Sequence, residues 1–300
     1  MAGSVLVILI VFDTDWPYVK QFEESAVYIQ FGFLFTALIG YLVNHKQILL
    51  GSLFFIAILC YFLKDASSNN LQTPQENNQM KLAVAHVNVS SVEESYQTFF
   101  SQLKGENLDI ISFQEIKPDW SVFLREELST IYPYKAENVR IDPFGMAIYS
   151  KYPIVTVDTI FYEQVPGLEA MILLPDENKI RVFNTMLTPS IDNQLDELQD
   201  HQLKYLGSYL NQNQSTSLIM GDFNMVYWSS RIRDFRIKTG LKNSRRDVSS
   251  SVLSIPYDHI FHSPNLECTM FRDLVDSLGY RLGISANLQF IESYTAKYKL

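Results

Sequence analysis

The sequence is poor in cysteine and in basic residues, and each shortage excludes a class of protein. Cysteine occurs only at Cys60 and Cys268 in 300 residues, which is too few for the disulfide framework of a small secreted domain. Acidic residues outnumber basic ones, 33 against 24, and the formal net charge is -9. This balance argues against a protein that binds nucleic acid non-specifically through a broad basic surface. A nuclease with a local cluster of basic residues stays open.

Apolar residues, by contrast, are plentiful and are concentrated near the N-terminus. Hydrophobic residues make up 47 % of the chain, enough for one large or two modest cores. Residues 25–43 and 48–63 are two uncharged apolar runs, close to the roughly 20 residues that a helix needs to cross a bilayer. A short polar turn separates them, and neither shows an amphipathic stripe. The sequence therefore predicts a transmembrane helical hairpin within a membrane-anchoring segment, residues 1–63.

The ends of this segment bear on its topology. Residues 1–12 are apolar but too short to span a bilayer alone; they fit a partial helix, a re-entrant piece or the core of a signal sequence. The turn between the two runs contains Lys46, whereas the stretch before the first run is mainly acidic. Lys and Arg near membrane ends are preferentially retained on the cytoplasmic side. We therefore expect the rest of the chain on the extracytoplasmic side of the membrane.

The texture of the sequence changes after the apolar runs. Residues 64–80 are rich in Asn, Gln and Ser, which is typical of a solvated linker. From residue 81 onward, short apolar or β-branched runs alternate with longer helical stretches such as residues 92–103 and 196–210. The short runs read LAVAHVNV, DIISFQE, GMAIYS, AMILL, IRVFNTML, SLIMGDF and DHIF. We expect one α/β (α+β) domain over residues 81–300.

Four of the predicted strands end on side chains that carry oxygen. These side chains are Asn88, Glu115, Asp222 with Asn224, and Asp258. If the strands end at one edge of a sheet, they gather hard oxygen donors, which suit Mg²⁺ or Mn²⁺ rather than zinc. A divalent ion beside amide donors is typical of a site that binds phosphate esters.

These segments, taken in order, resemble the endonuclease/exonuclease/phosphatase superfamily, also called DNase-like. The resemblance covers most of residues 81–292. It rests on the Asn88 segment, Gln114-Glu115, FGMAIYSKYPI at residues 144–154, GDFN at residues 221–224 with Trp228-Ser229 after it, and Asp258-His259-Ile260. It implies a four-layer αββα sandwich of two mostly antiparallel sheets flanked by helices, with the site at one edge of the sheets.

The resemblance also implies roles for the polar residues. Glu115 is expected to bind Mg²⁺ or Mn²⁺, and Asn88 belongs to the metal site because it helps to place the ion. Asp222 and Asn224 are the expected catalytic pair that orients the nucleophile and the phosphate, so Asn224 binds substrate as well. Asp258, the third catalytic residue, is expected to hold a histidine in position. A carboxylate placed like Asp222 orients or deprotonates water.

Two positions depart from the family pattern. Met186 stands where the family has a histidine or a tyrosine, and a thioether does not donate a hydrogen bond. The Ser-Asp-His segment that precedes the last strand of the family is missing, and Gly279 and Tyr280 align with its Asp and His. Asp258 is then left without its usual partner. The residues near the gap are Asp273, Asp276 and Arg281.

Two further features have a functional and a structural interpretation. His86 alternates in phase with Asn88, so it either lines the same cleft or is a hydrogen-bonded structural histidine. The most concentrated positive stretch of the predicted domain begins with Arg231 and Arg233. It either binds a phosphorylated substrate or an anionic head group, or it is a solvated basic loop.

Together these features predict a membrane-anchored, metal-dependent phosphoesterase. Its substrate would be a phosphate ester of nucleic acid, of a phospholipid head group or of another kind, and no protein partner is inferred. The alternative is a pseudoenzyme that uses the same fold to bind a phosphorylated ligand or a protein partner, because loss of one member of a cooperating site can cost several orders of magnitude in rate.

Overall fold

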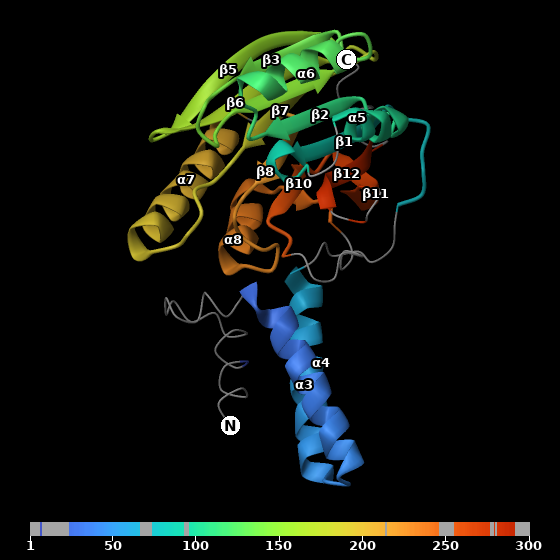
Figure 1. The fold of residues 1–300 in the computed structure, drawn as a ribbon, viewed down its shortest axis with the longest axis vertical. Coiled ribbons are helices and arrows are strands. Elements are labelled where there is room, and N and C mark those ends of the chain that lie inside the picture. The colour runs from blue at the N-terminus through green and yellow to red at the C-terminus, as the bar shows by residue number, and fades with distance from the viewer. Residues whose placement is uncertain are drawn as a thin grey trace. The chain divides into compact units, whose positions relative to one another are not determined.

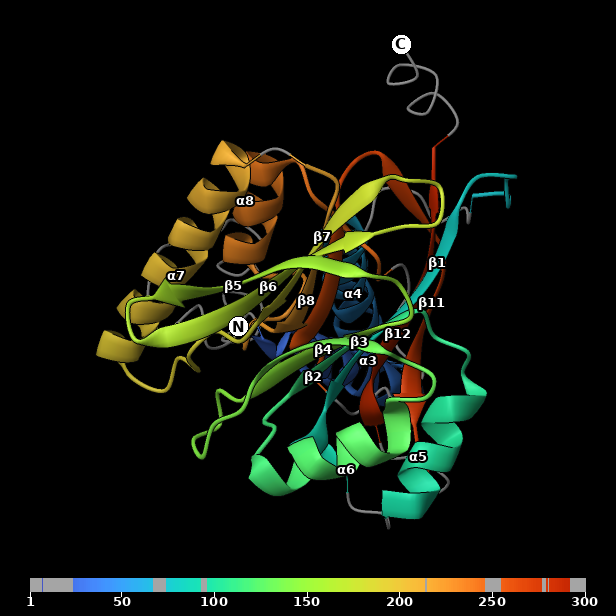
Figure 2. The same cartoon turned by 90° about the horizontal axis from the view of Figure 1, so that it is seen from above.

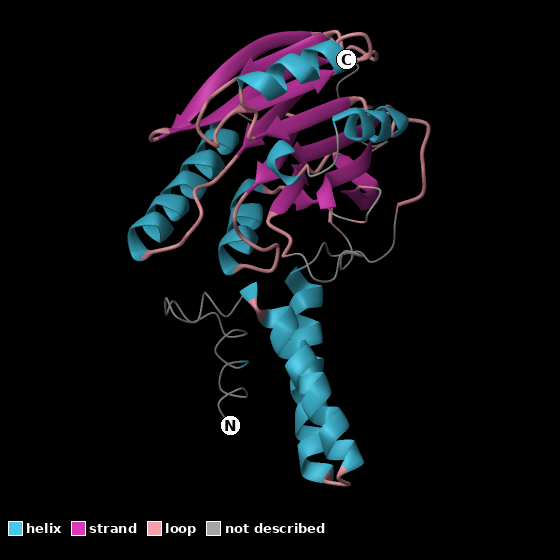
Figure 3. Cartoon of the chain, viewed as in Figure 1, coloured by secondary structure: helices cyan, strands magenta, loops and turns pink. Residues whose placement is uncertain are grey.

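The computed structural model describes residue 7 and residues 24–66, 74–92, 96–213, 215–245, 255–276, 279 and 281–291. The chain divides into two compact units, Met1–Asn69 with Met225–Asp234, and Asn70–Asn224 with Phe235–Leu300. We describe each unit by itself. Figure 1 gives the element labels, and Figure 3 distinguishes helices from strands.

The first unit contains a pair of helices, α3 (Ala26–Leu42) and α4 (Lys46–Ala66). The turn between them has Asn44 in the left-handed region, at φ 55°. A Cβ on Gly40 would lie 2.8 Å from the backbone nitrogen of Leu49, so the helices approach closely at the turn because this residue lacks a side chain. Large apolar side chains point outward along the pair, with Phe35 65 % and Leu42 72 % exposed.

The two helices differ in length as candidate membrane spans. Among the described helices, the stretch Lys46–Lys64 is long and apolar enough to cross a membrane, whereas Ala26–Leu42 is apolar but shorter. The predicted partial helix at residues 1–12 lies outside the described residues apart from Val7. The helical hairpin over residues 25–63 thus has its two helices, and its membrane insertion stays a prediction.

The second unit contains two six-stranded sheets. Sheet A has the strand order β11-β12-β1-β2-β4-β3, and sheet B has the order β5-β6-β7-β8-β10-β9. The strands of sheet A are β1 (Lys81–Asn88), β2 (Ile110–Gln114), β3 (Tyr134–Asn138), β4 (Met146–Ser150), β11 (Leu266–Val275) and β12 (Arg281–Phe290). Those of sheet B are β5 (Ile154–Tyr162), β6 (Val165–Leu173), β7 (Lys179–Thr185), β8 (Ser217–Asp222), β9 (Lys242–Asn243) and β10 (Asp258–His262).

The sheets pack face to face and helices cover their outer faces (Figure 2). One apolar cluster fills the space between the sheets and includes Val84 and Ile284 from sheet A and Val182 and Met220 from sheet B. A second cluster joins the outer face of sheet A to helices α5 (Tyr96–Gly105) and α6 (Pro118–Leu128). Helix α7 (Asn193–Gln212) lies along sheet B, where the ring of Tyr209 packs on that of Phe183. The predicted four-layer sandwich is therefore confirmed.

Most strand pairs are antiparallel, but each sheet contains one parallel pair, and these two pairs position the site. In sheet A, β1 and β2 run parallel with Asn88 opposite Gln114. In sheet B, β7 and β8 run parallel with Asn184 opposite Met220. Parallel neighbours end at the same edge of a sheet. The carboxyl ends of all four strands therefore carry their last side chains, and the loops that follow, to one edge of the sandwich.

Candidate active site

The ends of β1 and β2 bring an asparagine and a glutamate together. Asn88 donates a hydrogen bond from Nδ2 to Oε1 of Glu115 at 2.7 Å, while its Oδ1 accepts from the backbone nitrogen of Ser90 at 3.0 Å. Glu115 follows the last residue of β2 and has φ 59°. A non-glycine residue in this region is uncommon and marks a locally constrained backbone. The amide of Asn88 therefore holds the carboxylate of Glu115 at the edge of sheet A.

The GDFN sequence forms a tight turn after β8. Asp222 accepts a hydrogen bond at Oδ1 from the backbone nitrogen of Asn224 at 2.7 Å, and Nδ2 of Asn224 donates to the carbonyl of Leu187 at 2.8 Å. Gly221 has φ 153°, and a Cβ at this position would lie 1.8 Å from the carbonyl oxygen of Thr185. Glycine is therefore required for β8 to lie close to the end of β7 just before Asp222.

A polar bridge of two buried amides, Gln114 and Asn184, ties the two halves of the site together. Gln114 of sheet A donates from Nε2 to Oδ1 of Asn184 at 2.9 Å, and its Oε1 accepts from the backbone nitrogen of Asp222 at 3.1 Å. Asn184 of sheet B donates in turn to the carbonyl of Phe113 at 2.7 Å. Buried amides whose donors and acceptors are paired fix a single arrangement of the groups around them. The bridge therefore sets the position of Asp222 relative to Glu115.

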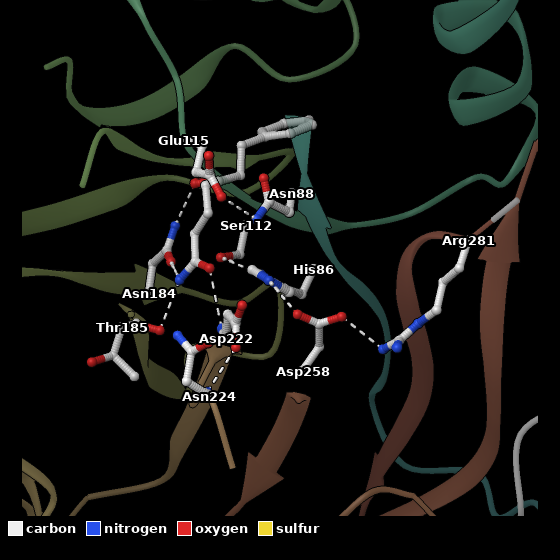
Figure 4. A network of polar contacts seen from close by, with 12 residues as sticks. His86, Asn88, Ser112, Glu115, Asn184, Thr185, Asp222, Asn224, Asp258 and Arg281 are labelled. Carbon is white, nitrogen blue, oxygen red and sulfur yellow. Dashed lines mark hydrogen bonds and ion pairs between the residues drawn. The ribbon is translucent and has the colours of Figure 1, made fainter. Parts of the chain in front are cut away.

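The carboxylate of Asp258 lies between two side chains from sheet A (Figure 4). Oδ2 accepts a hydrogen bond from Nη2 of Arg281 at 2.7 Å, and Oδ1 is 3.7 Å from Nε2 of His86. His86 is fully buried, with Nδ1 3.3 Å from Oγ of Ser112. Asp258 stands directly opposite Asp222 in the antiparallel pair of β10 and β8, and such residues have Cβ atoms about 4.5 to 5.5 Å apart.

The crowding of carboxylates changes the protonation of the site. Burial, and after it the neighbouring charge of Asp258, raises the pKa of Asp222 from 3.8 to about 7. Glu115 adds to this effect, whereas the backbone N–H of Asn224 and the charge of Arg281 oppose it. A carboxylate with a pKa close to neutrality is suited to accept a proton in catalysis at that pH.

The histidine of the cluster is affected in the opposite direction. Burial lowers the pKa of His86 from 6.5 to about 4, although the charge of Asp258 favours protonation. The imidazole is therefore neutral at neutral pH. Of the two interpretations of His86 from the sequence, the structure supports the hydrogen-bonded structural histidine, because the side chain is fully buried and contacts Ser112 beside the site.

The remaining predicted residues are placed as follows. Met186 is buried in the apolar cluster between the sheets and presents no hydrogen-bond donor. Gly279 has φ 88° with open space around it, and Tyr280 lies outside the described residues. Arg231 and Arg233 are on α8 (Ser230–Thr239), in the segment Met225–Asp234 that belongs to the first unit, and their substrate-binding role stays a prediction.

Comparison with known proteins decides what kind of chain contains this cluster. The sequence profile of the Endonuclease/Exonuclease/phosphatase family matches residues 85–280. The chain belongs to this family. The match begins on β1 and covers the strands whose ends carry Asn88, Glu115, Asp222 and Asp258. No curated protein sequence matches the chain.

Solved structures of the endonuclease/exonuclease/phosphatase fold resemble the second unit. A family protein from Bacteroides thetaiotaomicron has a TM-score of 0.60 at 16 % identity, with 72 % of this chain and 100 % of that one covered. A mannosyl-6-phosphatase from the same species gives 0.58 at 15 %, covering 70 % and 99 %. Humanised TDP2 from D. rerio gives 0.58 at 13 %, covering 70 % and 99 %. At these identities the likeness shows the fold.

Members of the endonuclease/exonuclease/phosphatase family generally use divalent metal ions, and the donors at this edge of the sandwich determine whether such an ion fits here. No three His, Cys, Asp or Glu side chains of the described residues lie close enough to hold an ion between them. Mg²⁺, however, is usually bound through one or two carboxylates with water and substrate phosphates as the other ligands. Glu115, held by Asn88, supplies such a carboxylate. The donor set fits a hard divalent cation that shares its ligands with substrate.

The sequence analysis gave no role to three of the residues that build this site. Gln114 and Asn184 are buried amides near strand ends, and Ser112 is a buried hydroxyl in the middle of β2. Gln114 directly precedes Glu115, which was the one local signal. The others have no motif of their own, because their partners come from distant parts of the chain.

Proposed function

We propose that this protein is a metal-dependent phosphoesterase that hydrolyses a phosphate ester at the edge of the sandwich. The observation that carries the proposal is the convergence of Glu115 and Asn88 from sheet A with Asp222 and Asn224 from sheet B. The bridge through Gln114 fixes the two pairs relative to each other. This arrangement provides a ligand for a cation and a base for water within one polar cluster.

The residues of the chain divide the chemistry as follows. Asp222, with its pKa raised to about 7, accepts a proton from the water that attacks phosphorus, while the ester P–O bond breaks and the leaving oxygen takes a proton from solvent. Asn224 uses one N–H of its amide to hold the turn through Leu187, and the second N–H is available for a phosphate oxygen. Glu115 would hold Mg²⁺ or Mn²⁺, which would supply positive charge to offset that of the phosphate oxygens.

The proposal is tested by hydrolysis of bis(p-nitrophenyl) phosphate and of plasmid DNA by the full chain in detergent, with Mg²⁺ or Mn²⁺. Glu115→Ala and Asp222→Ala are expected to abolish turnover. Glu127→Ala is the matched control, because Glu127 pairs with Lys104 on the surface of the same sandwich. Turnover that survives both site substitutions would contradict the proposal.

The helices of the first unit support a second part of the proposal, that the enzyme is anchored in a membrane. Residues 1–63 would be the anchor, residues 64–80 the linker and residues 81–300 the enzyme domain, on the extracytoplasmic side. The exposed apolar side chains of α3 and α4 support it, since such surfaces are favoured in lipid and rare in water. The protein should stay with membranes after an alkaline wash, and external protease should digest the domain in right-side-out vesicles.

One observation favours a different function. Met186 is an apolar side chain at a family position that elsewhere donates to phosphate, and it is buried among the core residues of both sheets. A protein that binds a phosphorylated ligand without hydrolysing it would tolerate this change. It would bind inorganic phosphate, measured by calorimetry, and show no turnover above Glu115→Ala.

A further inference from the structure

The site is rich in carboxylates, and their negative charge would repel an anionic ligand. Asp258 and Glu115 lie close enough to Asp222 for their charges to raise its pKa. A phosphate ester is itself an anion, so a cation of the chain, in addition to the proposed metal ion, would favour its binding beside these carboxylates. Among the described residues, Arg281 is the permanently charged side chain whose ion pair reaches this group.

The guanidinium of Arg281 is held on two sides. Nη2 donates to Oδ2 of Asp258 at 2.7 Å, and Nε lies 3.5 Å from Oδ1 of Asp273. Within the described residues, Nε makes no hydrogen bond. An arginine has five N–H donors in a rigid plane, and the bond to Asp258 uses one of them. Arg281 is thus oriented by two carboxylates; Nε is buried, and the N–H groups of Nη1 and the second N–H of Nη2 are left for a ligand.

The depth of the three side chains assigns them different parts. The side chain of His86 is 0 % exposed, whereas those of Asp258 and Arg281 are 17 % and 11 % exposed. His86 therefore cannot touch a substrate; it packs behind Asp258 and is held by Ser112. Asp258 and Arg281 form the accessible part of the group. The charge of Arg281 also opposes the rise in the pKa of Asp222.

We propose that Arg281 is the residue that binds the phosphate group of the substrate, with Asp258, Asp273 and His86 as positioning residues. This inference rests on the proposed function and names the cation of that site. An arginine binds two phosphate oxygens through parallel hydrogen bonds. It also stays charged across the accessible pH range, so phosphate binding should not weaken on the alkaline side as it would with a histidine.

The experiment compares the full chain in detergent with Arg281→Ala, Arg281→Lys and Arg272→Ala. Arg272 is the matched control, because it is an exposed arginine on β11 that pairs with Glu106. Hydrolysis of bis(p-nitrophenyl) phosphate and its inhibition by inorganic phosphate are measured at pH 6 to 9. Arg281→Ala should lose roughly 100- to 1000-fold in kcat/KM and most of its phosphate inhibition, and millimolar guanidinium should restore part of the rate. Arg281→Lys should recover only part of both, because an ammonium does not bind in a bidentate way.

The outcomes separate this inference from the proposed function. If the wild type is active and Arg281→Ala matches Arg272→Ala in rate and in phosphate inhibition, the inference is overturned and the function stands. If Arg281→Ala does not fold, a folded Arg281→Lys with wild-type phosphate inhibition overturns it equally. If the wild type has no turnover, calorimetry with inorganic phosphate decides: loss of binding in Arg281→Ala but not in Arg272→Ala supports it, and equal or absent binding overturns it.

Discussion

Replacing Asp222 with asparagine should make the protein more stable and less active. Asn keeps an oxygen at the position that accepts the backbone N–H of Asn224 and removes a charge that burial and Asp258 disfavour. The native pKa of Asp222 is about 7, against an ordinary 3.8. At about 1.4 kcal/mol per pH unit, the ionised form destabilises the native state by up to about 4 kcal/mol at pH 8.

The stability gain from Asp222→Asn should depend on pH, and this dependence provides an internal control for the experiment. Because the native pKa is raised, the native state binds this proton more tightly than the unfolded state, so stability falls as pH rises from about 4 to about 7. The gain from Asp222→Asn should therefore be near zero at pH 4 and should reach its full value at pH 8. The lowered pKa of His86 has the opposite slope, but it is present in both proteins and cancels in the difference.

The measurement is denaturant unfolding of wild type and Asp222→Asn at both pH values, with EDTA present so that no cation offsets the charge. We expect a gain of roughly 2 to 4 kcal/mol at pH 8. Each kcal/mol of this gain would also raise Tm by roughly 2 to 4 °C. The variant should also lose at least 100-fold in hydrolysis, the usual contribution of a general base. An equal effect at pH 4 and pH 8, or a loss of stability at pH 8, would refute the account of this carboxylate.

Three other outcomes are expected. The rate of hydrolysis should rise tenfold per pH unit below about pH 7, the pKa of Asp222, and level off above it. Asp258→Asn should move this pH midpoint lower, because it removes a charge that raises the pKa of Asp222. Gly221→Ala should destabilise the domain by several kcal/mol, because the new Cβ would lie 1.8 Å from a carbonyl oxygen of β7. Gly105→Ala should not, because a Cβ there would have nothing within 4 Å. Unfolding in urea distinguishes the two variants. Mg²⁺ should raise the Tm of the wild type, and Glu115→Ala should remove this increase.

The sequence predicted those parts of the site that are local. GDFN and Gln114-Glu115 are short segments in which a strand end and its polar residue are adjacent, so the strand and the side chain can be recognised together. Helix α7 was found for a similar reason, because its apolar positions repeat over 20 residues (Asn193–Gln212). The local sequence pattern was thus enough to predict these elements and the carboxylates Glu115 and Asp222.

The sequence did not predict which side chains from distant segments contact each other. The missing Asp-His pair suggested that Asp258 had lost its partner, yet Arg281, the first residue of β12, donates a hydrogen bond to it. Which face of β12 meets β10 depends on how the two sheets pack, and no periodicity reports it. Strand β5 was also missed, because it is an edge strand exposed along most of its length and lacks the alternation of a half-buried strand.

The order of the strands along the chain has a consequence for synthesis. Sheet B is one continuous stretch, Ile154–His262, whereas sheet A takes its first four strands before that stretch and its last two after it. During translation from the N-terminus, one edge of β1 therefore stays open until β12 emerges, roughly 10 to 40 seconds later at ordinary elongation rates. An open apolar strand is prone to pair with another chain. It also follows that His86 and Arg281 can flank Asp258 only after β12 has emerged, because Arg281 is the first residue of that strand.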